Sequence, residues 1–308
     1  MNNELVRVLT QRLDPVGCEV INLPARIWVF GGPTNSPGQP AASLRDCFWR
    51  RTLEPDFTRP WAEDLARPED FGDWWAFSGY SDLLTFERDA CFLARAIILF
   101  VESPGSFAEL GCLASQDSIL PQVLTIVQRK YWEQSARRSY LRLGPLQRVR
   151  SRGIECTIGT NEKTELPEDD FNAIVETIDA WLRINARRTH FDPKNISHIL
   201  LIIADIVDLI LVCKQIDIDA VLRFYGVIID EQILTQYLEL LSFFSLIQRE
   251  VRGKEIFWIQ VRDSDAPWVD HKATYGSRFV RENFKVFAKQ QIDRNDRLRS
   301  IYGRLHVL

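Results

Sequence analysis

The chain has 308 residues, of which 46% are hydrophobic and 26% are charged, an ordinary balance for a globular protein. This length predicts two domains, and the apolar content is sufficient for a core without a disulfide framework or a structural metal. The formal net charge of −4 excludes a protein that coats nucleic acid by bulk charge.

Cysteine, histidine and the N-terminal residues narrow the class of protein further. The six cysteines and four histidines are scattered, with no CxxC pair, so we expect reduced thiols, no metal site and a cytoplasmic location. The Met-Asn-Asn-Glu start lacks the basic and apolar segments of a secretory signal. The most apolar stretch, 196–213, contains His198, Asp205 and Asp208, which favours a helix in a domain or dimer core over a membrane span.

The first half of the chain alternates predicted strands with predicted helices. Three short apolar runs predict strands: 26–30, 96–101 and 123–127. Four segments predict helices: 44–53 with Ser43 as the cap, 86–94, a helix that opens at Ser106, and the apolar stripe 171–182. This alternation predicts an α/β domain over residues 1–188, with a mostly parallel sheet covered by helices on both faces.

The second half, residues 189–308, has a different pattern. Three helices are predicted: 196–213, a short helix capped by Asp217 or Asp219 that ends at Gly226, and 230–244. The segments 246–251 and 255–261 alternate apolar and polar residues around Arg252-Gly253-Lys254, which predicts a hairpin. Three helices followed by a two-stranded wing predict a winged helix-turn-helix domain.

Glycine-containing turns follow two of the predicted strands. Gly31-Gly32 ends the first strand, and the segment 102–111 (ESPGSFAELG) follows the second. Gly105 allows a tight turn there, Ser106 opens a helix, and Glu109 falls in its first turn. Two such turns at neighbouring strand ends predict a nucleotide or nucleoside site. The alternative is a capping box, in which Glu109 only binds the backbone N–H of Ser106.

Four motifs resemble one family: FGGP at 30–33, LLTFE at 83–87, AIILFVESPGSFAELG at 96–111 and SYLRLGP at 139–145. They are similar to the nucleoside deoxyribosyltransferase-like effectors of bacterial retrons, over most of residues 25–260. The resemblance implies a Rossmann-like domain followed by a winged helix. It also implies a homo-oligomeric toxin of anti-phage defence, restrained by a reverse transcriptase and its branched RNA–DNA. The implied chemistry is cleavage of an N-glycosidic bond, with NAD or a related nucleotide as substrate and no cofactor.

The resemblance also implies roles for particular residues. Glu109 matches the family's catalytic glutamate, whose carboxylate stabilises positive charge at C1′ or attacks it. The candidate substrate-binding residues are Gly31, Gly32, Asp64, Glu87, Ser103, Gly105 and Ser106. Ser103 stands where ordinary transferases carry an acid, and Trp28 stands near the place of a tyrosine that orients the glutamate. Both departures favour a hydrolase over a base-exchanging transferase.

Three features near this site have two interpretations each. The acidic pairs Glu63-Asp64 and Glu69-Asp70 either hold the substrate or form a solvated loop. The aromatic stretch 74–80, with Trp74, Trp75, Phe77 and Tyr80, forms a lid or is part of a core or an oligomer contact. Glu87 points into the crevice or toward solvent.

Charge is distributed unevenly along the chain. Residues 128–153 carry eight basic side chains against one acid, and 278–304 carry eight against three, which favours an anionic partner over a solvated helix face. The predicted recognition helix 230–244 has three acids and no Lys or Arg, so operator reading is disfavoured. The candidate partner contacts are Arg148, Arg150, Arg152, Arg252 and Lys254. The alternative functions are a non-catalytic nucleotide sensor and a ligand-responsive winged-helix regulator.

Overall fold

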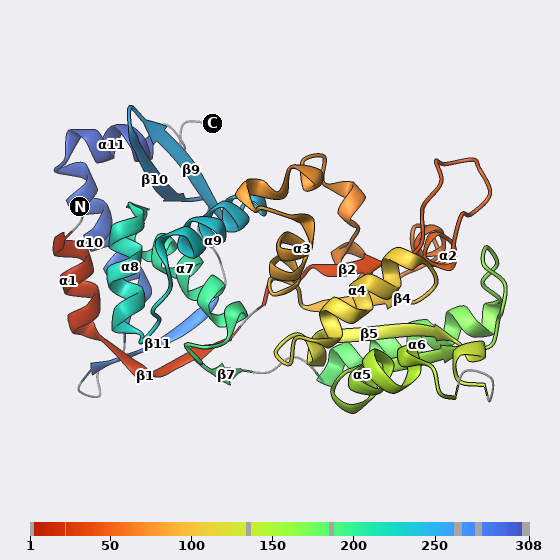
Figure 1. Cartoon of the computed structure of the whole chain (residues 1–308). Coiled ribbons are helices and arrows are strands. Elements are labelled where there is room, and N and C mark those ends of the chain that lie inside the picture. Colours follow the sequence, from red (N-terminus) through yellow and green to blue (C-terminus); the bar gives the residue numbers. More distant parts are fainter. Residues whose placement is uncertain are drawn as a thin grey trace. The chain divides into compact units, whose positions relative to one another are not determined.

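The structure is a computed structural model that describes residues 3–21, 23–133, 137–184, 188–261, 267–274 and 279–303. The chain forms two compact units (Figure 1). The first, here called the sheet unit, comprises Pro24–Trp75 and Asp82–Ala186. The second, here called the terminal unit, comprises Met1–Leu23, Ala76–Ser81 and Arg187–Leu308.

The sheet unit is built on five parallel strands in the order β3-β2-β4-β5-β6. The strands are β2 (Ile27–Phe30), β3 (Leu65–Ala66), β4 (Ala96–Phe100), β5 (Val123–Gln128) and β6 (Ile154–Ile158). Every residue of β2, β4 and β5 is buried, as expected for strands covered on both faces. The predicted α/β architecture with a parallel sheet is therefore confirmed.

Five helices of the sheet unit lie around this sheet (Figure 1). They are α2 (Leu44–Thr52), α3 (Leu83–Cys91), α4 (Pro104–Ala114), α5 (Gln147–Arg152) and α6 (Glu168–Ile184). Side chains of α2 and α6 form a core with one face of the sheet, including Phe48, Phe100 and Ile178. Short 3-10 or π segments fill the loops: η1 (Ala62–Asp64), η2 (Pro68–Asp70), η3 (Trp74–Gly79), η4 (Leu120–Gln122), η5 (Arg129–Tyr131) and η7 (Arg142–Leu146).

The terminal unit combines helices with two small antiparallel sheets, β11-β1-β7 and β8-β10-β9. Its helices are α1 (Asn3–Arg12), α7 (Ile196–Ile210), α8 (Gln215–Phe224), α9 (Glu231–Phe243), α10 (Arg281–Asp293) and α11 (Asp296–Gly303). Its strands are β1 (Leu13–Val20), β7 (Thr189–His190), β8 (Val212–Cys213), β9 (Ile247–Arg252), β10 (Glu255–Gln260) and β11 (Val269–Ala273). The three predicted helices and the predicted hairpin are present in the expected order.

Two features of the terminal unit differ from expectation. The helix expected over 196–213 ends at Ile210, because Leu211 has a φ of 70° and residues 212–213 pair with β10 instead. The first 23 residues belong with the C-terminal unit rather than with a contiguous domain 1–188, because β1 pairs with β11 and β7. Among the described residues, no helix has the length and apolar character needed to cross a membrane.

A buried polar network ties the elements of the terminal unit to α7. Asp205, which is fully buried, accepts hydrogen bonds from Arg281 on α10 (Nη2–Oδ1 2.8 Å) and contacts His271 Nε2 on β11 (2.7 Å). The Asp208 carboxylate accepts hydrogen bonds from Arg281, Lys285 and Gln260. Two of the three polar residues that made 196–213 a poor membrane span, Asp205 and Asp208, therefore anchor α10 and β11.

Candidate functional site

The carboxyl ends of β2 and β4 lie side by side, because the two strands are parallel neighbours. Gly31 and Gly32 follow β2, and Glu102 and Ser103 follow β4 shortly after its last residue. Gly31 has a φ of 154°, and a Cβ there would lie 2.8 Å from the Phe100 Cβ and 3.0 Å from the Arg45 Cβ. The two predicted turns therefore meet at the edge where open α/β sheets bind ligands.

Glu102 joins these two turns. Its carboxylate accepts hydrogen bonds from the backbone N–H groups of Gly32 (2.9 Å), Leu44 (2.8 Å) and Arg45 (3.1 Å). Leu44 and Arg45 are the first residues of α2, whose N–H groups have no partner within the helix, so the carboxylate serves as a second cap beside Ser43. The sequence motif contained Glu102, but nothing in its pattern indicated this structural role.

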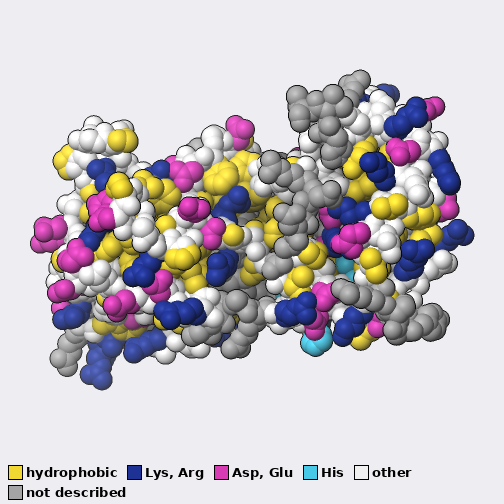
Figure 2. All heavy atoms as spheres, turned by 180° about the vertical axis from the view of Figure 1, so that it is seen from behind, with side chains coloured by type: hydrophobic (Ala, Val, Ile, Leu, Met, Phe, Trp, Pro, Cys, Tyr) yellow, Lys and Arg dark blue, Asp and Glu magenta, His cyan; other side chains and the backbone are white. Residues whose placement is uncertain are grey.

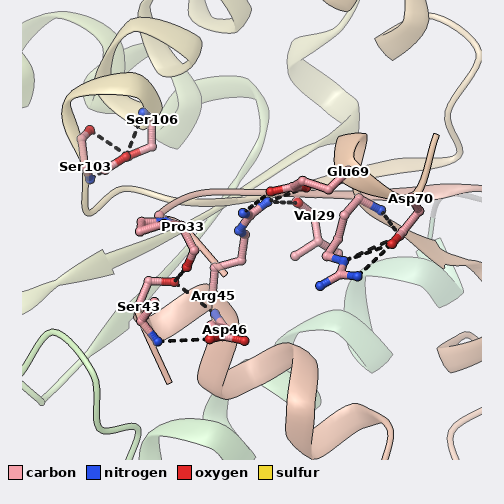
Figure 3. Close-up of polar contacts among 12 residues, drawn as sticks. Val29, Pro33, Ser43, Arg45, Asp46, Glu69, Asp70, Ser103 and Ser106 are labelled. Atoms are coloured by element: carbon pink, nitrogen blue, oxygen red, sulfur yellow. Dashed lines mark hydrogen bonds and ion pairs between the residues drawn. The ribbon is translucent and has the colours of Figure 1, made fainter. Parts of the chain in front are cut away.

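The start of α4 differs from the prediction. Ser103, rather than Ser106, is the N-cap, and Ser106 Oγ accepts hydrogen bonds from the N–H groups of Ser103 (2.8 Å) and Glu102 (3.0 Å). Figure 3 shows the two serines facing each other. Pro104 fits the first helical position, where no N–H is needed, so the helix opens before Ser106. The capping box is thus Ser103 with Ser106. Glu109 lies beyond the first turn and has no part in it.

Glu109 instead lines a pocket of about 310 Å³ formed by the end of β2 and the facing sides of α3 and α4. Most of its lining is apolar, with Phe30, Leu83 and Leu113 among the contributors. Glu109 Oε2 is buried and has no hydrogen-bond partner among the described residues. The pKa of Glu109 is raised from its ordinary 4.5 to about 8. Burial is the main cause, and the nearby charge of Glu87 contributes to the same rise.

Glu87 lines the same pocket, so the interpretation in which it points into the crevice is the one that the structure matches. Its Oε1 accepts a hydrogen bond from the indole Nε1–H of Trp74 at 3.1 Å. Burial raises the pKa of Glu87, while the bond from Trp74 opposes that rise. The structure thus brings two carboxylates together in one largely apolar pocket, with Gly105 at its wall.

The aromatic segment after β3 contributes to the core at Trp74. This side chain is fully buried and makes edge-to-face contacts with Trp28 (centroids 5.0 Å apart) and Phe86 (4.9 Å). Trp28 itself donates its indole N–H to the carbonyl of Ala90 (3.3 Å). Tyr80 is also buried, and the side chains of Trp75 and Phe77 lie outside what the structure describes.

A buried arginine near the site was not predicted. Arg45 on α2 donates to Glu69 Oε1 (Nη2–O 2.6 Å) and to the carbonyl of Val29 (3.3 Å), as Figure 3 shows. Beside them, Arg67 and Asp70 form their own pair at 2.7 Å. The second acidic pair of the predicted loop, Glu69-Asp70, is therefore neutralised by arginines. The sequence offered no signal for Arg45, which looked like an ordinary helix-surface residue.

Asp64 is not part of the pocket. It ends η1, directly before β3, and its carboxylate pairs with Arg95, which lies directly before β4 (3.9 Å). Both positions are at the amino ends of parallel strands, the edge opposite Glu109. The prediction that Asp64 binds substrate together with Glu109 is corrected accordingly, because Asp64 precedes β3 and so lies at the amino edge of the sheet.

The predicted partner contacts are partly engaged within the chain. Arg148 and Arg152 both pair with Asp117, Arg152 at 3.1 Å, and the Arg150 guanidinium lies over the Trp132 ring (5.3 Å). In the hairpin, Arg252 pairs with Glu250 (2.6 Å), and Lys254 follows the turn glycine Gly253. On the face shown in Figure 2, acidic and basic side chains are interspersed. Within the described residues, no group of three or more His, Cys, Asp or Glu could hold a metal ion.

Comparison with known proteins supports the coarser part of the motif-based resemblance, that of a retron effector. A model of the STM3845 retron effector protein family matches residues 41–249, more than half of the chain. An Escherichia coli protein named "Retron Ec86 putative ribosyltransferase/DNA-binding protein" is 33% identical over 121 residues. The alignment spans 38% of this chain and 38% of that protein. The chain belongs to the STM3845 family of retron effector proteins.

Proposed function

We propose that this retron effector is an N-glycosidase that hydrolyses NAD or a related nucleotide, in a Rossmann-like domain of the nucleoside deoxyribosyltransferase type. The observation that carries the proposal is the position of Glu109, which lines an apolar pocket at the carboxyl edge of the sheet and takes no part in helix capping. The E. coli relative is named a putative ribosyltransferase, which supports the same class of chemistry.

The chemistry follows from the carboxylate and its surroundings. Breaking a C1′–N bond develops positive charge on the sugar, which an adjacent carboxylate stabilises or captures as a glycosyl ester. A largely apolar wall strengthens this interaction because it excludes water. A base that leaves as a neutral molecule, as nicotinamide does, requires no strong general acid, which suits a pocket with no histidine in its lining.

The direct test uses protein purified free of its retron partners. It is incubated with NAD, NADP, nucleosides and deoxynucleoside triphosphates, and the products are separated by chromatography. We expect release of the free base from one of these, and loss of that activity in Glu109→Gln. Binding of a nucleotide without cleavage, equal in wild type and variant, would instead establish the non-catalytic sensor.

For the terminal unit we propose a winged-helix module that contacts the retron's reverse transcriptase and branched RNA–DNA rather than an operator. Helix α9 has no Lys or Arg, and its Glu239 is paired with Arg249 of the hairpin (3.0 Å). A protein that recognises base edges needs hydrogen-bond donors and a positive electrostatic potential that attracts phosphates. The hairpin and the basic residues 148–152 are the better candidates for phosphate contact.

A further inference from the structure

We propose that Trp74 is a positioning residue for hydrolysis: its indole N–H holds the Glu87 carboxylate in the pocket, where Glu87 takes the proton of the attacking water. This inference rests on the proposed glycosidase function. It assigns different tasks to the two carboxylates, with Glu109 stabilising the sugar cation and Glu87 activating water.

Packing fixes the direction of the indole N–H. Trp74 has no exposed surface, and its ring is held edge-to-face between Trp28 and Phe86. Phe86 directly precedes Glu87 on α3. The phenyl ring that packs against the indole and the carboxylate that the indole binds are therefore carried by the same helical turn. An indole that cannot rotate aims its one donor at a fixed point, and that point is Glu87 Oε1 at 3.1 Å.

The other charges near the pair largely cancel one another. Arg45 is bound to Glu69, and Arg88 is bound to Asp89 (2.7 Å). The pKa values of the Cys91 and Cys112 thiols are raised by burial, so both thiols stay neutral. What distinguishes the two carboxylates is therefore the hydrogen bond from Trp74, which Glu87 receives and Glu109 Oε2 lacks among the described residues.

This difference decides which carboxylate is ionised first. A hydrogen bond to a charged carboxylate favours the ionised form, so Glu87 loses its proton before Glu109 does. The raised pKa of Glu109 agrees with this order. A carboxylate that is ionised and held in place is what a general base for water requires.

The hydrolysis then balances as follows. The C1′–N bond breaks, and its electron pair stays on the base nitrogen, which neutralises a cationic base such as nicotinamide. Ionised Glu109 stabilises the positive charge left at C1′. The oxygen of one water molecule bonds to C1′, and its proton goes to Glu87, which later returns it to solvent. The products are the free base, the sugar with a hydroxyl at C1′, and one proton.

The test compares Trp74→Phe with Trp61→Phe in protein purified free of its retron partners, with NAD as the probe. Trp61 is a matched control, because it is also buried and also donates its indole N–H to a carboxylate, that of Asp179 (2.7 Å), but Asp179, unlike Glu87, does not line this pocket. We expect Trp74→Phe to lower kcat about ten-fold with KM unchanged, and Trp61→Phe to change neither.

The pH profile separates positioning from a merely structural role. The mechanism needs both carboxylates ionised, so the acidic limb of the rate profile has two steps, of which the lower belongs to Glu87. Without the indole donor the pKa of Glu87 rises, so this lower step must move to higher pH. Glu87→Gln retains an acceptor for Trp74 but cannot take a proton, and we expect about a hundred-fold loss in kcat, with no further loss when Trp74→Phe is added.

Three outcomes are decisive. If wild-type protein cleaves none of the substrates, the proposed function fails, and this inference fails with it. If wild type is active and Trp74→Phe keeps both its kcat and its acidic limb, only the inference is overturned. If Trp74→Phe does not fold, Glu87→Gln decides alone, and full activity of that variant overturns the inference.

Discussion

Glu102 and Gly32 are 70 residues apart in the chain, yet the Glu102 carboxylate accepts the backbone N–H of Gly32 at 2.9 Å. The same carboxylate binds the first two N–H groups of α2. One side chain at the end of β4 therefore fixes both the turn after β2 and the start of a helix. These elements form the edge of the sheet next to the pocket.

Replacing Glu102 with Ala leaves three backbone N–H groups without their acceptor. Hydrogen bonds to a charged acceptor are individually strong, so we expect the free energy of unfolding to fall by about 3 kcal/mol. Denaturant titration measures this. Glu63→Ala is the control, because Glu63 is exposed, and it should change stability by less than about 0.5 kcal/mol. Equal effects of the two substitutions would contradict the assigned role of Glu102.

Gly31 and Gly105 separate backbone strain from ligand contact. Gly31→Ala adds a Cβ 2.8 Å from that of Phe100 at a positive φ, so we expect a loss of about 2 kcal/mol in unfolding free energy. Gly105 lies in α4, where the nearest atom to a Cβ would be Ser103 Oγ at 3.9 Å. The expectation that Gly105 allows a tight turn is wrong, because this residue lies within α4 and does not have a positive φ. Gly105→Ala should therefore preserve stability, and activity lost in this stable variant would locate the ligand beside it.

The raised pKa of Glu109 predicts a specific dependence of stability on pH. Folding favours the protonated form, so its stabilising effect is present below about pH 4.5 and is lost as pH rises through about 8. Glu109→Gln removes this titration. We expect the variant to be more stable than wild type at pH 9, by about 2 kcal/mol, and similar to it at pH 5. If the unfolding free energies of wild type and variant instead change in parallel between pH 5 and pH 9, Glu109 is not desolvated.

The sequence predicted the elements of the sheet unit more reliably than the partners of its polar residues. Apolar runs such as 96–101 have one low-energy solution, a strand covered on both faces, so β4 and its neighbours were predicted within a residue or two. The helix at Glu109 was also predicted, but its first residue was not, because Ser103 and Ser106 are both good caps. Only the proline between them favours the earlier one.

Long-range partners explain what was missed. β1 pairs with β11, about 250 residues away, and nothing local in 13–20 indicates that partner. Glu102, Arg45 and Trp74 acquire their roles only when distant backbone groups or carboxylates meet them. Glu109 was predicted from a motif, whereas its burial, and therefore its pKa, depends on how α3 packs against α4.

The last prediction concerns the basic residues 148–152 and sharpens the proposed contact with nucleic acid. Arg148 and Arg152 both pair with Asp117, whose side chain is 60% exposed. Asp117→Asn removes the ion pairs of both arginines, so we expect tighter binding of a branched RNA–DNA and a salt dependence that is steeper by up to about two phosphate contacts. Neutralising Arg148, Arg150 and Arg152 together should have the opposite effect, with the KM for nucleotide unchanged. Filter binding at several salt concentrations measures both variants. If an exposed ion pair competes with phosphate, removing its acid must increase the affinity for the nucleic acid. If Asp117→Asn binds no more tightly and the triple variant binds no more weakly, these arginines therefore serve the fold alone.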